Sequence, residues 1–405
     1  MSQLLGNHIF SVGRCGFGLL ALFLCANISA QNAADSLQVQ IDSVAAENVA
    51  VADSASKKSR WDTLLDWKFL AVPTVAYQPE TRWAFGVAGA YYFNCKEQTK
   101  VSDIYFDGAY TLNKQWNANV LSTVYFGGGT RWFMYAKVGF KRYPDYFYGI
   151  GNDTKRLLGE RIAFSSDNVT FSAQPQCYVG EHWIVGASVD FRWEKPSTSV
   201  NLDSVAQFCS VAGLDRSFVM LGLGALVSYD SRDTQFYPHR GIFFKAVGNY
   251  YEPYLGSTYR MGSVAAEFRQ FVPIYKDLIF AWQVKTDFTF GKNKPVQMLP
   301  TLGGLDEVRG IRRGQFRDDV ALALQAELRI PIWRFLKATV FGGIGDVYNL
   351  QNWQFAVPKV GYGAGLRVAV NKAKVNVRFD VARSNINPSW KLDGWNFYLT
   401  IKEAF

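Results

Sequence analysis

The residue types that most often carry catalysis or bind metals are scarce in this sequence. Three histidines and five cysteines are present, and the histidines are His8, His182 and His239. A hydrolase needs a nucleophile beside a base, and a metal site needs ligands at a characteristic spacing. His182 and His239 fall at turns between expected strands, and Cys95, Cys177 and Cys209 show no ligand spacing with them. We therefore expect no catalytic residue, no metal and no cofactor, with the three cysteines as structural thiols.

Composition indicates a protein of many short strands. The 405 residues are 49% hydrophobic and 16% aromatic, with 35 glycines and a net charge of +9. Aromatic residues favour strands and frequent glycines favour turns. The length and the composition exclude a disordered tail protein, a collagen and a small disulfide scaffold. The longest uncharged apolar stretch after the N-terminus, 217–229, is shorter than the roughly 18 to 20 residues of a membrane-spanning helix. Because no nucleic-acid motif and no phosphate-binding glycine loop occurs, we expect no nucleic-acid partner.

The N-terminus has the features of a secretory signal. Arg14 precedes the apolar core 16–24, and Ala30 is a small residue suited to cleavage, so residues 1–30 are expected to be a signal peptide. Cys25 raises the alternative of a lipid anchor, but Leu24 before it is not the small residue that lipidation requires. Residues 31–66 show no sustained period and are expected to form a short periplasmic segment.

From residue 68 onward, apolar and polar residues alternate. Over 374–383, Val375, Val377, Phe379 and Val381 share one face, while Lys374, Asn376, Arg378 and Asp380 share the other. Residues 280–290 and 322–330 repeat the pattern, again with charges confined to one face. A soluble sandwich would bury the apolar face against a second sheet, whereas a membrane barrel turns it to lipid and keeps the charges in the lumen. Because so many charges share one face of long strands, we favour the all-β transmembrane barrel, with residues 67–405 as its domain.

Counting such runs predicts sixteen antiparallel strands. The expected ranges are 68–78, 82–94, 102–113, 115–127, 131–142, 160–178, 181–195, 214–230, 239–250, 258–273, 276–291, 317–332, 334–346, 358–371, 373–384 and 394–405. An even number places both ends of the barrel on the periplasmic side. The longest connections then fall outside and the shortest inside, as in bacterial outer-membrane barrels. We therefore expect an integral protein of the bacterial outer membrane with periplasmic termini.

The last expected strand ends the sequence on an aromatic residue. Its apolar parity consists of Trp395, Phe397, Leu399, Ile401 and Phe405. An alternating strand closed by a C-terminal Phe looks like the signal that outer-membrane barrels present to their assembly machinery. Phe397, Leu399, Ile401 and Phe405 are therefore the expected assembly signal.

Three motifs together resemble the BamA/TamA family of outer-membrane barrels, which includes the bacterial surface antigens. The first is a turn motif between strands eight and nine, with Asp230, Arg232, Asp233, Pro238, Arg240 and Gly241. The second is Val308-Arg309-Gly310 in the long loop 292–316, which matches the family's loop six. The third comprises the runs 325–329, 341–345 and 361–367 on consecutive strands. Their order and spacing match the family over about residues 67–405.

The resemblance implies that loop six folds into the lumen, where its arginine meets an acid on the wall. Glu327 shares the lumen parity of Gln325 and Arg329, so Arg309 and Glu327 are the expected pair; the alternative is a solvated Arg309 beside Arg312 and Arg313. The family's acid on strand thirteen corresponds to Gly343 here. Asp346 has the opposite parity, which leaves a second acidic partner open and predicts a looser latch.

Two functions from different classes follow. The resemblance implies insertion or translocation of proteins or lipids at the outer membrane. The family generally carries POTRA receptor domains, which residues 31–66 are too short to hold, so periplasmic or outer-membrane assembly partners are expected to replace them, with membrane lipid as a further partner. The alternative is a diffusion or gated channel for anions, lined by Lys285, Arg329, Arg367, Lys374 and Arg378. A hydrolase is disfavoured because both remaining histidines lie at the periplasmic end.

Overall fold

The computed structural model describes most of the chain after residue 68. The described residues are 69–78, 82–93, 102–126, 131–153, 162–198, 216–234, 237–333, 336–351, 353, 358–369, 376–386, 391 and 394–401. The expected signal peptide 1–30 and segment 31–66 lie outside them. Within the described part, no helix is both long enough and apolar enough to cross a bilayer.

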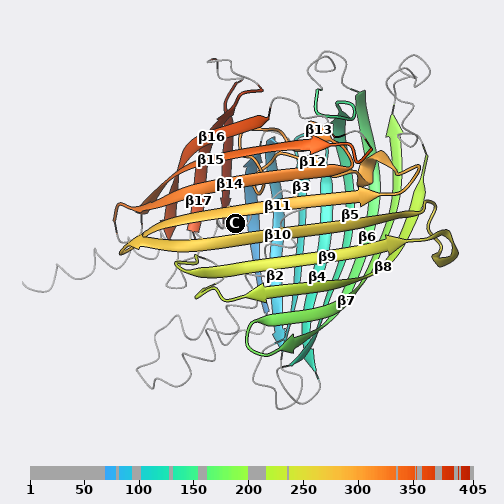
Figure 1. Ribbon diagram of the computed structural model, residues 1–405, viewed down its shortest axis with the longest axis horizontal. Helices are drawn as coiled ribbons and strands as arrows, with labels where there is room; N and C mark the ends of the chain where they lie inside the picture. Colours follow the sequence, from blue (N-terminus) through green and yellow to red (C-terminus); the bar gives the residue numbers. More distant parts are fainter. Residues whose placement is uncertain are drawn as a thin grey trace, which may run out of the picture.

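Within the described residues, sixteen strands form one antiparallel sheet (Figure 1). They are β1 (Phe69–Gln78), β2 (Arg82–Phe93), β3 (Ser102–Thr111), β4 (Trp116–Phe126), β5 (Trp132–Phe147), β6 (Ile162–Val179), β7 (Trp183–Thr198), β8 (Phe218–Asp230), β9 (Gly241–Tyr251), β10 (Met261–Tyr275), β11 (Leu278–Phe290), β14 (Val320–Pro331), β15 (Leu336–Tyr348), β16 (Lys359–Ala369), β17 (Asn376–Ser384) and β18 (Asn396–Ile401). All sixteen expected strands are confirmed. The largest shift is at the end of β5, which continues to Phe147.

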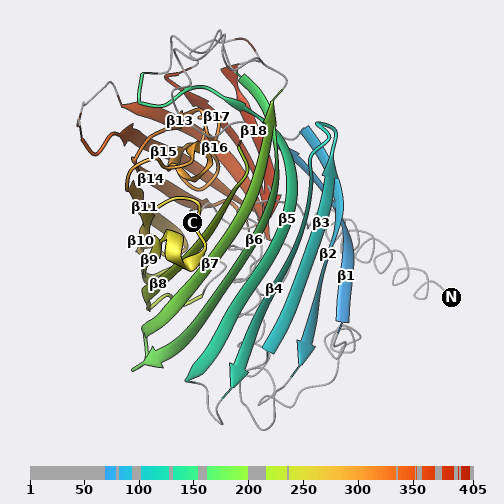
Figure 2. The same ribbon diagram turned by 90° about the vertical axis from the view of Figure 1, so that its right-hand side faces the viewer.

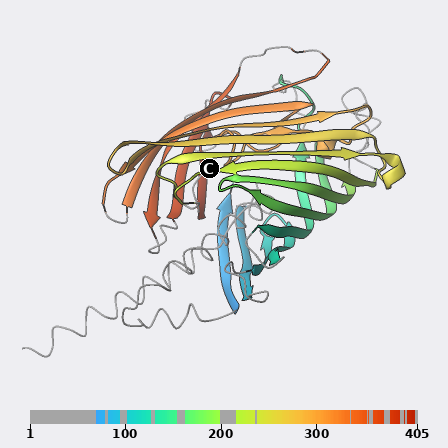
Figure 3. The ribbon, with the colours of Figure 1, turned by 60° about the horizontal axis from the view of Figure 1, so that its bottom comes forward.

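Each of these sixteen strands pairs with the next of the sixteen along the chain, and β1 lies beside β18 through the pair Tyr77 and Leu399. Figure 3 shows the blue first strands adjoining the red last strands on the same curved sheet. The sheet curves because strands twist against their neighbours. Its concave face carries one parity of side chains and its convex face the other.

The two faces differ in the way that the alternation predicts. Exposed apolar side chains of the convex face include Trp83, Phe85, Val120, Phe140, Leu223, Leu324, Val340 and Leu366. The concave face holds buried polar residues, among them Asn119, Glu194, Gln325, Glu327, Arg367 and Asp380. An apolar convex surface of this extent is unusual for a protein surrounded by water alone.

The connection between β11 and β14, residues 291–319, is called loop six below. It contains a short 3-10 helix, η4 (Val296–Met298), and two paired two-residue strands, β12 (Thr301–Leu302) and β13 (Phe316–Arg317), none of which the alternation predicts. Figure 2 shows this orange connection inside the curve of the sheet. Because β12 and β13 pair with each other and not with the sixteen-stranded sheet, loop six packs against the concave face instead of extending the sheet.

Candidate functional site

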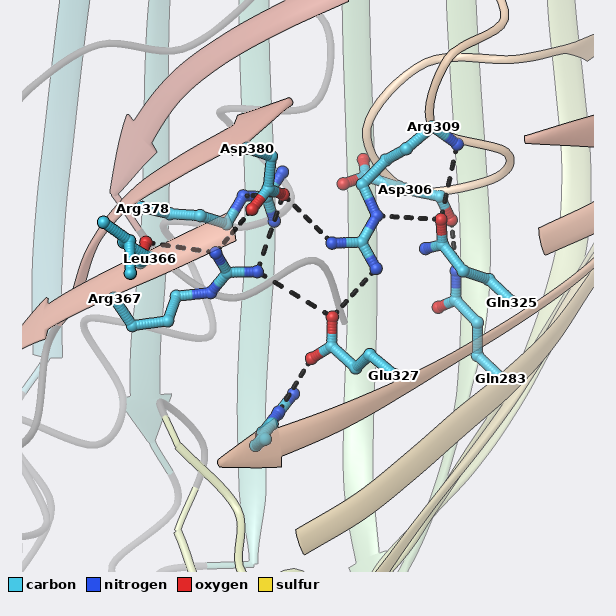
Figure 4. A network of polar contacts seen from close by, with 10 residues as sticks. Gln283, Asp306, Arg309, Gln325, Glu327, Leu366, Arg367, Arg378 and Asp380 are labelled. Atoms are coloured by element: carbon cyan, nitrogen blue, oxygen red, sulfur yellow. Dashed lines mark hydrogen bonds and ion pairs between the residues drawn. The ribbon is translucent and has the colours of Figure 1, made fainter. Parts of the chain in front are cut away.

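Arg309 of loop six reaches two strands of the concave face. Its Nη2 donates to Glu327 Oε2 at 2.8 Å, and its Nη1 donates to Asp380 Oδ2 at 3.0 Å (Figure 4). Its Nε donates to Gln325 Oε1 at 3.0 Å. The expected pair of Arg309 and Glu327 is thus formed. The alternative of a solvated arginine is wrong, because the residue is 1% exposed.

The carboxylates of this network are shared among several guanidinium groups. Glu327 Oε1 accepts from Arg329 Nε at 2.7 Å, and its Oε2 lies 3.9 Å from Arg367 Nη2. Asp380 Oδ1 accepts from Arg367, and its Oδ2 lies 3.1 Å from Arg378 Nε. Both carboxylate side chains are completely buried. Buried charges are tolerated only when paired and hydrogen-bonded, so each partner depends on the others.

Asp380 is the second acidic partner that the sequence left open. It lies on the predicted polar face of 374–383, but that pattern gave no sign that loop six reaches β17. Asp346 has a different role, because its Oδ1 accepts from Lys359 Nζ at 2.6 Å. The expectation of a looser latch is therefore wrong for the described geometry: Arg309 has an acid on each side.

Small residues on β15 and β16 let the backbone of loop six lie close to the sheet. A Cβ on Gly361 would lie 2.0 Å from the carbonyl oxygen of Arg309, and a Cβ on Gly345 would lie 2.7 Å from Leu302. The Arg309 guanidinium lies 3.6 Å from the centre of the Phe341 ring, a favourable cation–π contact. The glycines provide space and Phe341 provides an aromatic floor for the same arginine.

Apolar side chains of loop six complete this contact. Leu302, Val308, Ile311 and Phe316 form a buried cluster with Ala321, Ala323 and Val347 of the strands. Ile311, which follows Arg309 and Gly310, is 1% exposed. Gly310 has φ +100°, and a Cβ there would lie 2.4 Å from the Arg383 carbonyl oxygen, so glycine is required.

The last strand also holds loop six. The Tyr398 hydroxyl accepts a hydrogen bond from the Gly310 amide at 3.2 Å, and Asn396 Nδ2 donates to the Gly310 carbonyl oxygen at 2.8 Å. Tyr398 and Asn396 have the parity opposite to the apolar one of the last strand, so the alternation predicts that they face inward but not that they bind loop six. Phe397 and Leu399 have the other parity and are partly exposed. Ile401 ends β18, and Phe405 lies outside the described residues.

A second ion pair fixes the opposite flank of loop six. Lys285 Nζ lies 3.3 Å from Glu307 Oε1, and Glu307 Oε2 accepts from the Gly303 amide at 2.9 Å. Gln283 donates to the Asp306 carbonyl oxygen. Burial raises the pKa of the Glu307 carboxyl, although Lys285 opposes the shift. Loop six is therefore attached to β11 on this side and to β14 and β17 on the other.

The turn motif lies between β8 and β9, as predicted. Arg232 forms a bidentate ion pair with Asp230: its Nε donates to Oδ1 at 2.9 Å and its Nη2 donates to Oδ2 at 2.7 Å. Asp233 Oδ1 accepts from the backbone amides of His239 at 3.0 Å and Arg240 at 3.4 Å. Gly241 has φ +113°, and a Cβ there would lie 2.4 Å from the Ser231 carbonyl oxygen. These residues shape the turn, and the carbonyl oxygen of the buried Pro238 accepts from Arg329 Nη1 at 3.4 Å.

Comparison with known proteins defines the class. The model of the Omp85 superfamily domain matches residues 158–405, so the chain belongs to the Omp85 superfamily. Among solved structures it is similar to BamA from Haemophilus ducreyi lacking POTRA domains 1-3, with 12% identity, a TM-score of 0.60 and coverage of 83% of this chain and 70% of that one. It is also similar to CdiB from Escherichia coli, with 12% identity, a TM-score of 0.56 and coverage of 83% and 62%. No curated protein sequence matches it.

Proposed function

We propose that this Omp85 member is a transmembrane barrel of the bacterial outer membrane that assists insertion or translocation of proteins or lipids. Membership of the superfamily and the BamA-like sheet support this assignment. The apolar convex face and polar concave face suit a barrel in lipid. In the proposed orientation both chain ends are periplasmic, loop six enters the lumen from outside, and assembly partners receive the clients.

The observation that carries the proposal is the burial of Arg309 between Glu327 and Asp380. A loop exposed to solvent needs no buried cation. Burying a cation without an anionic partner costs several kcal/mol of stability. We propose that Val308-Arg309-Gly310 is a latch that holds loop six in the lumen and fixes β14, β17 and β18 relative to each other. The C-terminal strand then serves both as an assembly signal and as one wall of the latch.

The anion channel has less support. Of its expected basic lining residues, Lys285 pairs with Glu307, and Arg329, Arg367 and Arg378 are at most 1% exposed. Lys374 lies outside the described residues. Guanidinium groups occupied by Glu327 and Asp380 are not available to solutes that pass through a pore.

The test is quantitative proteomics of the outer membrane after depletion of this protein in its own host. Rescue is compared between wild type, Arg309→Ala and Lys292→Ala, the last an exposed cation of the same loop. The expected result is the loss of many barrel proteins, or of one defined set, which Lys292→Ala rescues and Arg309→Ala does not. Full rescue by Arg309→Ala with an unchanged proteome would overturn the assembly role.

A planar-bilayer measurement separates the latch from the channel. The wild-type protein is expected to conduct poorly and erratically until residues 304–314 are deleted. Steady, anion-selective steps from the wild type would instead establish the channel and remove the latch from the mechanism.

A further inference from the structure

The turn between β8 and β9 reaches the same ion network from the end of the sheet opposite loop six. Antiparallel pairing places Gly241 beside Phe271, and Ile279 beside Arg329, at one end of the strands. Loop six joins β11 and β14 at the other end. The side chain of Tyr237 in this turn is completely buried, although it belongs to a short connection. A buried aromatic residue in a turn needs a packing partner inside the sheet.

Two cations of the concave face pack on the Tyr237 ring. Lys337 Nζ lies 3.3 Å from the ring centre, and the Arg329 guanidinium lies 4.9 Å from it. Arg329 also lies 5.3 Å from the centre of the Phe271 ring, and its Nη1 donates to the Pro238 carbonyl oxygen. The turn thereby fixes Arg329 through a ring face and a backbone acceptor.

Glu327 links this arrangement to loop six. Its Oε1 accepts from Arg329 and its Oε2 from Arg309, so its two oxygens face opposite ends of the sheet. A carboxylate held at only one oxygen can rotate, whereas one held at both is fixed. Arg329 therefore determines where the acceptor for Arg309 lies.

We propose that Tyr237 and Pro238 are positioning residues for loop six, acting through Arg329 and Glu327. The β8–β9 turn is then a second arm of the latch, and docking of the turn and docking of loop six favour each other. By reciprocity, a partner that displaces the turn at its end weakens the hold on Arg309 at the other. This inference rests on the proposed function for the role of the latch, whereas the coupling itself is a property of the fold.

Hydrogen exchange of the full chain in detergent micelles tests the coupling. The readout is exchange in the peptide 303–314, which contains the bonded amides of Arg309 and Gly310. Tyr237→Ala is expected to accelerate it about tenfold, a typical coupling between sites, while Tyr237→Phe keeps the ring and the wild-type rate. Tyr254→Ala, at a side chain that is 82% exposed in the next connection, is the matched control and should change nothing.

A double-mutant cycle identifies the path. In an Arg329→Gln background, adding Tyr237→Ala should change the exchange of 303–314 by less than about twofold, because the link is already cut. The same tenfold acceleration in both backgrounds would overturn the route through Arg329. Acceleration confined to 231–242, or spread equally over β3–β7, would overturn the coupling. Should Tyr237→Ala fail to fold, Tyr237→Leu carries the same predictions, because it keeps bulk without the ring face.

The two proposals fail separately. A tenfold effect of Tyr237→Ala together with full rescue by Arg309→Ala in the proteomic experiment would leave the coupling standing and overturn the assembly role. Unchanged exchange with failed rescue would overturn the coupling alone.

Discussion

The concave face is built differently in its two halves. In β3–β7 the polar side chains bond to neighbours set by strand register: Asn119 lies opposite Asp107 and donates to it at 2.9 Å, and Asn168 lies opposite Glu194 and donates to it at 3.1 Å. In β14–β17 the central bonds are made to Arg309, which lies 71 positions before Asp380. Equal periodicity therefore produces a wall in one half and a docking site in the other. Loop six also packs Val296 and Leu299 against the ends of β5 and β6, so the difference comes from Arg309, whose ion pairs are made with β14 and β17.

The largest expected effect comes from removing the shared carboxylate of the docking site. Glu327→Gln removes the carboxylate that Arg329 bonds and one of the two carboxylates that Arg309 bonds, and it should lower the free energy of unfolding by about 3–5 kcal/mol. Glu194→Gln, its counterpart in β7, should cost less than about 2 kcal/mol, because the Arg192 side chain is 16% exposed and can be solvated. Urea unfolding in micelles measures both, and equal costs would contradict the distinction between the halves.

Filling the space under loop six should have the next largest effect. Gly361→Ala places a methyl group 2.0 Å from the Arg309 carbonyl oxygen, and we expect a loss of about 1–3 kcal/mol with faster proteolysis of loop six. Gly342→Ala is the matched control, since its nearest neighbour would lie 4.0 Å away. Unchanged proteolysis of Gly361→Ala would show that loop six does not rest on the glycines.

The aromatic floor gives a smaller and more specific effect. Phe341→Leu removes the ring beneath Arg309 and should cost about 1–2 kcal/mol more than Phe133→Leu, because a desolvated cation–π contact adds to the lost packing. Phe133 is a similarly buried aromatic residue of β5 whose ring neighbours are Tyr125 and Tyr178. The difference between the two unfolding free energies is the measurement, and a difference near zero would leave Arg309 held by its ion pairs alone.

The smallest effect is expected outside both polar regions. Arg142 and Asp167 form an ion pair at 2.5 Å, but their side chains are 53% and 34% exposed. Solvent screens such pairs, so the urea midpoint of unfolding of Arg142→Ala should equal that of the wild type within error. A clear drop would indicate that exposed pairs stabilise the long β5–β6 hairpin more than burial predicts.

Features set by neighbouring residues could be predicted from the sequence, whereas contacts between residues far apart in the sequence could not. Alternation fixed sixteen strands and the parity of Glu327, because a strand turns successive side chains to opposite faces irrespective of its partners. The three motifs indicated the family and the pair of Arg309 and Glu327. The alternation does not predict Asp380 as a partner of Arg309, because the pattern indicates only that Asp380 faces inward. The conformation of loop six decides that Arg309 reaches it.

The sequence by itself determined the sheet, its two faces and the position of loop six in the strand order, since these depend on local period and turn residues. Only the tertiary structure decided that Asp380 and Tyr398 hold loop six and that Tyr237 reaches Arg329 from the opposite end. Those contacts join segments far apart in the chain, and their free energy comes from burying charges together. No periodic pattern encodes which buried charges will meet.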